Sequence, residues 1–275
     1  MDQKQRLRIG AVSYLNTKPL VYRLAEFAPN AEVVYDVPSR LADQLAAGTL
    51  DVALIPSIEY LQHADYRVVS NACIACRGPV LSVKLFSRIP MERIRSLALD
   101  EGSRTSVALA RILLRQRFGL TPDLLPLPLD TDARLTDADA VLLIGDRAIR
   151  PAPDAYALEW DLGQQWWDWS GLPFVFAMWT ARSGTDADQL AVALQQARDA
   201  GLQELPAIAE REASAVGLTA DECLVYLRDY LYFFLGTHEL RGLREFSRLA
   251  AEIGMVPPTA AAMPRELILH DCRDS

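Results

Sequence analysis

The chain has 275 residues, of which 51% are hydrophobic and 23% are charged, and its formal net charge is −8. These values are typical of a folded globular protein of about two domains and exclude extensive disorder; an acidic balance without a basic cluster argues against a nucleic-acid partner. Four cysteines are too few for a disulfide scaffold. Without an apolar signal segment at the N-terminus or an uncharged apolar run of membrane-spanning length, we expect a cytoplasmic protein with no membrane partner.

The first part of the chain alternates predicted strands and helices. Ser39 is a suitable N-cap, Gly48 suits the position just after a helix, and Ser57 is a second candidate cap. Alternation of this kind predicts a parallel sheet with helices on its faces. The predicted elements are strands at Leu7–Ser13, Glu32–Val37 and Asp51–Pro56 and a helix at Arg40–Ala47.

The alternation begins again after a strand predicted at Val80–Ser87. After Ser183 every element is predicted to be helical, and Thr219 and Glu222 have the spacing of a capping box. The elements predicted in between are strands at Leu97–Leu99, Leu124–Leu129, Ala138–Ile144, Tyr156–Leu162 and Leu172–Ala181 and helices at Val107–Phe118 and Gly163–Trp169.

Two α/β blocks separated by long apolar strands predict an α/β fold with two lobes. The first lobe is expected to hold residues 1–84 and 182–275, which include the C-terminal helices, and the second lobe residues 85–181. The chain is expected to cross between the lobes twice, near Ser82–Ser87 and near Phe174–Arg182. A double crossover forms a hinged cleft, and such clefts are favoured sites for small ligands.

The loop after the first predicted strand carries four neutral polar side chains, Ser13, Tyr14, Asn16 and Thr17. It leaves the carboxyl end of that strand, where ligands bind in open α/β sheets, and the N-terminus of the following helix favours an anion. These side chains are therefore candidates for substrate binding. The alternative is that they only cap the helix.

A second polar loop, Glu101–Ser106, also lies between a predicted strand and a predicted helix. Its hydroxyls on Ser103, Thr105 and Ser106, the charge of Arg104 and the free amides of the helix start suit a carboxylate or a phosphate. A nucleotide is not expected, because the loop has neither the Walker A lysine nor a G-x-G-x-x-G pattern. The alternative is a capped helix with a solvated arginine.

Four further polar side chains are candidates for the cleft. Asp146 follows a predicted strand and could accept a proton or a substrate hydrogen bond, or it could cap a helix or pair with Arg147. Ser57 and Glu59 follow the third strand, although a carboxylate in a first helical turn is favourable in any case. Ser82 lies in the predicted crossover, where its hydroxyl either bonds the backbone or points into the cleft.

No metal site is predicted. Cys73 and Cys76 form a lone C-x-x-C pair with no second pair and no histidine at zinc-ligand spacing. The histidines are scattered, so neither a metal site nor a Ser-His-Asp triad is visible. Buried thiols are the favoured interpretation of the two cysteines.

Six segments, taken together and in this order, resemble the chorismate dehydratase family of the futalosine route to menaquinone. The fold of that family is similar to type II periplasmic solute-binding proteins, in agreement with the two predicted crossovers. A sister family, the dihydroxynaphthoate synthases, usually opens with a Ser-Pro-Cys-Pro-Asn-like loop, from which Ser13-Tyr14-Leu15-Asn16 departs. The six segments are Gly10–Leu20, Gly48–Tyr60, Val80–Pro90, Leu97–Leu109, Ala140–Ala148 and Asp161–Trp179.

The resemblance implies a carbon–oxygen lyase (a hydro-lyase) that removes water from chorismate to give 3-[(1-carboxyvinyl)oxy]benzoate. Aromatisation of the ring drives such a reaction, so no cofactor is implied. Asn16, Ser82 and Thr105 are expected to donate to substrate oxygens. The base is Asp146, Glu59 or the side-chain carboxylate of the substrate itself.

Two other kinds of function stay open at this point. One is a solute receptor or a ligand sensor that binds a small carboxylate without converting it, and the other is the activity of the sister synthase. A monomer and a homodimer are both compatible with the sequence.

Overall fold

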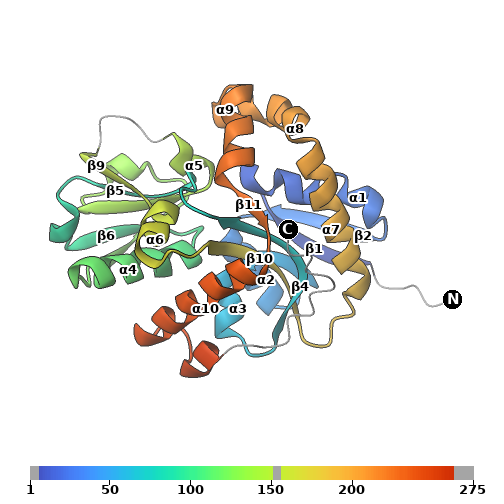
Figure 1. The fold of residues 1–275 in the computed structure, drawn as a ribbon, viewed down its shortest axis with the longest axis horizontal. Helices are drawn as coiled ribbons and strands as arrows, with labels where there is room; N and C mark the ends of the chain where they lie inside the picture. Colours follow the sequence, from blue (N-terminus) through green and yellow to red (C-terminus); the bar gives the residue numbers. More distant parts are fainter. Residues whose placement is uncertain (1–5, 151–155, 263–275) are drawn as a thin grey trace.

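The structure, a computed structural model, describes residues 6–150 and 156–262 and has two lobes, each built on one β-sheet (Figure 1). The spatial order of the strands is β11-β4-β10-β3-β1-β2 in the first lobe and β7-β6-β8-β5-β9 in the second. The first sheet contains β1 (Leu7–Val12), β2 (Ala31–Asp36), β3 (Val52–Pro56), β4 (Tyr66–Cys76), β10 (Phe174–Arg182) and β11 (Tyr232–Phe234). The second contains β5 (Val83–Ser87), β6 (Ser96–Asp100), β7 (Asp123–Leu127), β8 (Ala140–Ile144) and β9 (Leu158–Asp161).

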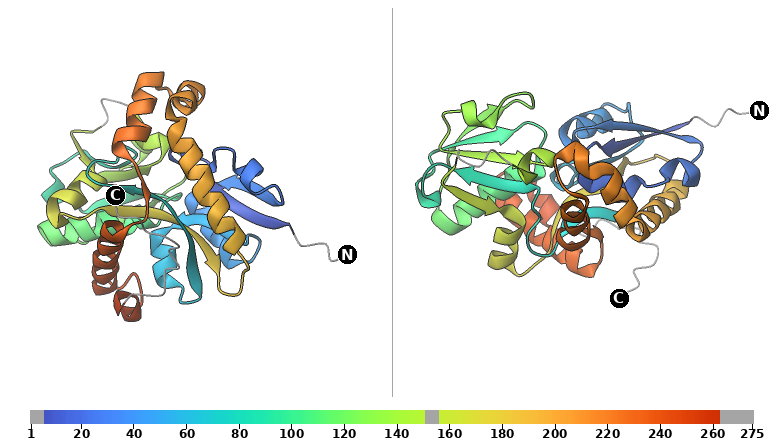
Figure 2. Two further views of the ribbon diagram at one scale, coloured as in Figure 1. Left: turned by 45° about the vertical axis from the view of Figure 1, so that its right-hand side comes forward. Right: turned by 90° about the horizontal axis from the view of Figure 1, so that it is seen from above.

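Helices surround both sheets, as Figure 2 shows from two further directions. They are α1 (Leu24–Phe27), α2 (Pro38–Ala46), α3 (Ser57–Gln62), α4 (Thr105–Phe118), α5 (Asp146–Ile149), α6 (Leu162–Ser170), α7 (Asp188–Gln203), α8 (Leu205–Glu212), α9 (Ala220–Val225) and α10 (Thr237–Glu252). Helix α7 packs against β4 and the 3₁₀ helix Leu15–Val21, whereas α10 packs against β10 and contacts α4 of the second lobe. No helix in the described part of the chain combines the length and the apolar character that a membrane crossing requires.

The most apolar segments of the sequence form the central strands. Val52–Pro56 and Ala140–Ile144 are buried at every position, as expected for strands that are covered on both faces. Strand β1 pairs in parallel with β2 and β3, and β6 pairs in parallel with β7 and β8. In each lobe the carboxyl ends of these strands therefore lie at one edge of the sheet, where ligands bind in open α/β folds.

The chain passes between the sheets twice, but not where the sequence suggests. Strand β4 was not expected, because Ser70 and Asn71 interrupt its apolar pattern, and the first passage follows its end at Cys76. Strand β10 pairs antiparallel with both β3 and β4, so it belongs to the first sheet. The predicted assignment of residues 174–181 to the second lobe is corrected accordingly: the second passage precedes Phe174.

The C-terminal region is not entirely helical. Strand β11, which has three aromatic residues, pairs antiparallel with β4 at the edge of the first sheet. Before it, Tyr226–Tyr230 forms a π-helical turn that continues from α9. Helical periodicity alone misses this strand, because the edge of β4 supplies the backbone partners that aromatic residues with high strand propensity can use.

Helix ends confirm some predictions and correct others. The capping box of Thr219 and Glu222 is present, and Gly48 has a left-handed φ of 72° just after α2. Ser39 is not an N-cap, because α2 begins one residue earlier at Pro38, which suits the first turn. Ser57 is not a cap either: it is the first residue of α3, and its hydroxyl bonds to another strand.

Candidate active site

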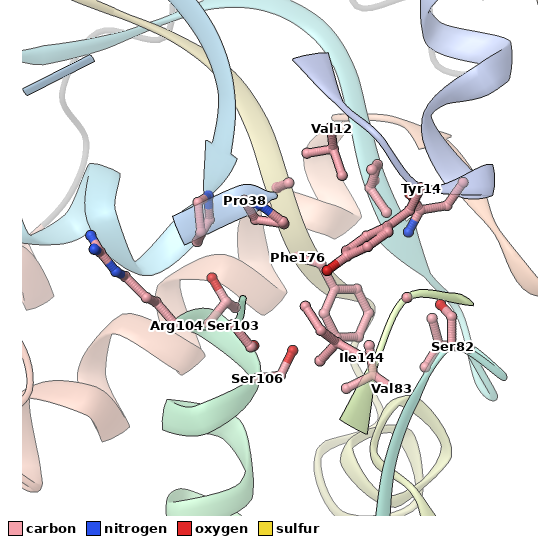
Figure 3. A pocket seen from close by; sticks show the side chains of 17 residues that line it. Val12, Tyr14, Pro38, Ser82, Val83, Ser103, Arg104, Ser106, Ile144 and Phe176 are labelled. Atoms are coloured by element: carbon pink, nitrogen blue, oxygen red, sulfur yellow. The ribbon is translucent and has the colours of Figure 1, made fainter. Parts of the chain in front are cut away.

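A cavity lies between the lobes (Figure 3). It opens at the carboxyl ends of β1, β3 and β8, next to the N-terminus of α4. Its polar lining residues, all of which were predicted as site residues, are Tyr14, Asn16, Ser82, Ser103, Arg104, Thr105 and Ser106. Its other lining residues are Val12, Pro38, Pro56, Ile74, Val80, Val83, Ile144, Gly145, Phe176 and Ala177.

Tyr14 reaches from the first lobe into the second. Its ring lies against Gly145, where an added Cβ atom would sit 2.6 Å from a ring carbon. Its hydroxyl is directed toward the middle of the cavity, is buried and has no hydrogen-bond partner among the described residues (Figure 3). Burial and the negative charge of Asp100 raise the pKa of this hydroxyl. Tyr14 therefore stays protonated and can donate to a ligand.

Asn16 is oriented by its neighbours. The Oγ1 of Thr17, which is fully buried, donates to the Oδ1 of Asn16 over 3.3 Å. The backbone N–H of Leu15 donates to the Oδ1 of Asp146 over 3.1 Å, which ties the loop to the second lobe. With its Oδ1 engaged, Asn16 has its amide N–H groups left to donate, and the Tyr226 hydroxyl and a ligand are acceptors within their reach. Thr17 and Asp146 thus position Asn16 and do not line the cavity themselves.

The two carboxylates predicted as bases both lie outside the cavity lining. Asp146 accepts the backbone bond from Leu15; burial raises the pKa of its carboxyl, and that bond lowers it. Glu59 is buried, and its Oε1 lies 3.0 Å from Nη1 of Arg104. The predicted role of either group as a general base therefore has no support from geometry.

Arg104 joins the lobes. Besides Glu59, its guanidinium binds the Oδ1 of Asp43 on α2 over 2.6 Å. Two first-lobe carboxylates therefore neutralise this second-lobe cation, and the guanidinium points away from the middle of the cavity (Figure 3). The cavity is lined by the stem of the side chain more than by its charge.

Ser57 and Thr105 form a second connection between the lobes. The Ser57 hydroxyl donates to the carbonyl of Val175 over 2.7 Å and lies 3.4 Å from Oγ1 of Thr105. That Oγ1 accepts the backbone N–H of Ile58 over 3.2 Å. Because the Ser57 hydrogen is used on Val175, Thr105 is left to donate to Ser57. Thr105 therefore joins α4 to α3, and because it also lines the cavity, its donation to a substrate oxygen stays a prediction.

The start of α4 supplies the remaining polar surface. Ser103 and Ser106 are buried and line the cavity, and no side chain caps the first turn of the helix, whose N-cap is Arg104. Free backbone N–H groups at a helix start favour an anion. Ser13, in contrast, is exposed and outside the cavity lining, so its predicted contact with substrate is not supported.

Ser82 and Tyr226 lie together at the side of the cavity. Ser82 is 1% exposed, and its Oγ has no well-formed hydrogen bond within the described ranges. Tyr226 is fully buried; burial raises the pKa of its hydroxyl, while hydrogen bonding to the Ser82 and Asn16 side chains lowers it. Tyr226 lies in the region after Ser183 that was predicted only to be helical, and no local motif could have revealed that it meets residues so distant in sequence.

The apolar lining was also missed. Ile144 and Phe176 were interpreted as strand residues only, although both lie where a strand meets the cavity. The position of Ile144 at the end of a predicted strand is the signal that could have found it, whereas Phe176 lies inside the predicted strand Leu172–Ala181 and had no such signal. No group of three or more His, Cys, Asp or Glu side chains within residues 6–150 and 156–262 is arranged to hold a metal ion.

Comparison with known proteins identifies the family. Residues 7–252 match the model of a family described as menaquinone biosynthesis. The chain belongs to this family. A curated relative named chorismate dehydratase, from Thermus thermophilus, is 32% identical over 264 residues, which cover 87% of this chain and 93% of the relative. A second relative of the same name, from Campylobacter jejuni, is 30% identical over 177 residues, or 61% and 64% of the two chains.

Solved structures show how this family member is folded. Protein AF1704 from Archaeoglobus fulgidus aligns with a TM-score of 0.71 at 17% identity, covering 92% of this chain and 100% of that one. The periplasmic aliphatic sulphonate binding protein SsuA from Escherichia coli aligns with a TM-score of 0.60 at 17% identity, covering 96% and 94%. The predicted periplasmic-binding-protein-like α/β fold is confirmed.

Proposed function

We propose that this protein is a chorismate dehydratase, which converts chorismate into 3-[(1-carboxyvinyl)oxy]benzoate and water. Family membership and the names of the two curated relatives support the activity. The observation that carries it furthest is the composition of the cavity: among its 17 lining residues in the described part of the chain, hydroxyl and amide donors are present and no carboxylate is. Such a site suits a small dianion.

The proposed binding mode follows from the donors. The uncapped start of α4, with Ser103 and Ser106, is suited to one substrate carboxylate. Asn16, Ser82 and Tyr14 supply N–H and O–H groups on the opposite side, where the leaving hydroxyl and the ether oxygen would lie. The apolar lining around Phe176 excludes water and favours the uncharged ring.

The reaction is an elimination that needs a base for one proton. The C–H bond of the ring carbon that bears the ether breaks, its electron pair forms the new ring double bond, and the C–O bond of the neighbouring hydroxyl breaks. The proton and the departing hydroxide leave together as water, and the ring becomes aromatic. We propose that the side-chain carboxylate of the substrate first accepts the proton and then passes it to the leaving group. Asn16 and Ser82 hold the reacting groups in place.

Amide substitutions test this assignment of the base. Asp146→Asn keeps an acceptor oxygen for the N–H of Leu15, and Glu59→Gln keeps one for Arg104. Both variants are therefore expected to lower turnover by less than about tenfold. Removal of a true general base costs about 10²- to 10⁴-fold. Steady-state turnover with chorismate measures the difference. A loss of about 10³-fold in either folded variant would reject substrate assistance.

One assay tests the function itself. Purified protein mixed with chorismate is expected to form a product lighter by one water, detected by mass spectrometry, without any added cofactor. Tight binding of chorismate without conversion would instead favour a receptor or sensor. Absence of both would remove chorismate as the substrate and direct attention to the reaction of the sister synthase. We further propose that the product serves menaquinone synthesis by the futalosine route in the cytoplasm.

A further inference from the structure

The turn that connects the two lobes just before β5 is strained. The backbone N–H of Ser82 donates to the carbonyl of Val80 over 2.7 Å, which closes a three-residue turn with Leu81 at its centre. Leu81 has a φ of 63°, one of only two positive values among the non-glycine residues of the described chain. A bulky L-residue in this region costs free energy, so other contacts must stabilise the turn.

The carboxylate of Asp161 supplies those contacts. Both of its oxygens lie 3.0 Å from the backbone N of Val80, and its Oδ2 accepts from the N–H of Leu81 over 2.6 Å. Its Oδ1 also accepts from the N–H of Gln164 over 3.0 Å, as the N-cap of α6. One half-buried carboxylate therefore ties the strained turn to the first turn of a helix in the second lobe.

The residue that follows this turn is Ser82. Its carbonyl accepts from the N–H of Gly145 over 2.8 Å, at the end of β8, so the backbone is held on that side as well. Its hydroxyl lines the cavity and is buried, and among the described residues it has no well-formed hydrogen bond, only a weak one with the Tyr226 hydroxyl beside it. A buried hydroxyl without a well-formed hydrogen bond is costly unless a ligand supplies one. The turn keeps the hydroxyl in this otherwise unfavourable position.

We infer that Asp161 is a positioning residue of the active site: it stabilises the left-handed turn at Leu81 and thereby holds the Ser82 hydroxyl toward the substrate. Asp161 does not line the cavity, so it acts through the turn that carries Ser82. The inference rests on the proposed function, since it assigns Ser82 a task in the elimination.

The first test is Asp161→Asn. Asparagine is as good an N-cap as aspartate, so α6 is kept, but one acceptor oxygen is replaced by a donor that cannot bind the N–H groups of the turn. Turnover of chorismate is expected to fall about tenfold with little change in KM, because the misplaced group acts in the reaction more than in binding. Unchanged turnover would overturn the inference.

Two further variants separate positioning from general stability. Glycine adopts positive φ without strain, so Leu81→Gly in the Asp161→Asn background is expected to restore most of the lost turnover. In a Ser82→Ala background, Asp161→Asn is expected to cause no further loss, because its effect passes through that hydroxyl. Failure of the glycine to restore turnover, or a full additional loss in the Ser82→Ala background, would contradict the role.

Asp139 offers a matched control. Its Oδ2 accepts the backbone N–H groups of Arg95 and Ser96 over 2.8 and 3.0 Å, at the end of the second sheet away from the cavity. Asp139→Asn is expected to keep wild-type turnover. If the wild-type protein does not convert chorismate, the proposed function fails, and hydrogen exchange decides this inference separately. Faster exchange at Leu81 and Ser82 in Asp161→Asn than in Asp139→Asn supports it, and equal exchange overturns it.

Discussion

Turnover of chorismate is expected to fall by about 10²- to 10³-fold when Asn16 or Ser82 is replaced by alanine, while the fold is retained. Both side chains line the cavity, and each offers donors to a ligand: the amide N–H groups of Asn16 and the hydroxyl of Ser82. Donors held in place before the reaction stabilise the charge that develops on the departing oxygen. Steady-state kinetics and a thermal melt of each variant give the measurement.

Ser13→Ala is the matched control for these two variants. Ser13 lies in the same loop as Asn16 but is exposed and outside the cavity lining, so its loss should leave turnover near the wild-type value. Near-normal turnover in both Asn16→Ala and Ser82→Ala would reject their assignment. A large loss in Ser13→Ala would indicate that the loop as a whole, and not the Asn16 amide, matters.

Gly145→Ala is expected to lower kcat/KM by about 10²-fold, since displacement of a positioning group by about 1 Å has effects of this size. The added methyl group would sit 2.6 Å from a carbon of the Tyr14 ring, in space that the ring now fills. Tyr14 would have to move, and with it the hydroxyl at the middle of the cavity. The two sides of the cavity would then not meet at Gly145 and Tyr14 as they do here. Kinetics with chorismate measure the loss.

The control for Gly145→Ala places a methyl group at a positive φ without a steric neighbour. Gly171 has a φ of 66° against 60° for Gly145, although its ψ of 15° is left-handed helical and that of Gly145 is −144°, and nothing lies within 4 Å of an added Cβ. Gly171→Ala should therefore cost only about 1 kcal/mol of stability and leave kcat/KM unchanged. Equal kcat/KM values in Gly145→Ala and Gly171→Ala would show that the contact between Gly145 and Tyr14 does not affect catalysis.

Much of the fold was predictable because its central strands are buried on both faces. Val52–Pro56 and Ala140–Ile144 are apolar at every position, and such runs predict buried parallel strands from local sequence alone. Strands β4 and β11 were missed for the opposite reason: polar residues interrupt the first, and the second follows a helical pattern. Each becomes a strand because the other, or β10, offers it a backbone partner.

The polar lining of the cavity was also predictable, since it lies in loops that follow predicted strands. What each residue does there was not. Glu59 and Asp146 have the chemistry of a base, yet each accepts a bond from the opposite side of the cleft. Asp161, by contrast, was interpreted only as the end of a strand, and its bonds to Val80 and Leu81 link residues about 80 positions apart.

By itself the sequence determined the α/β alternation, the two-lobed plan and the set of hydroxyl and amide groups that follow its strands, because these depend on apolar periodicity and on the direction of each strand. Only the tertiary structure decided which polar groups are free for a ligand. A donor or acceptor is free or occupied according to what lies within about 3 Å of it, and for Glu59 and Asp146 that neighbour comes from the other lobe. The amino-acid composition, which is close to average and mildly acidic, does not distinguish a polar group that is free for a ligand from one that is occupied.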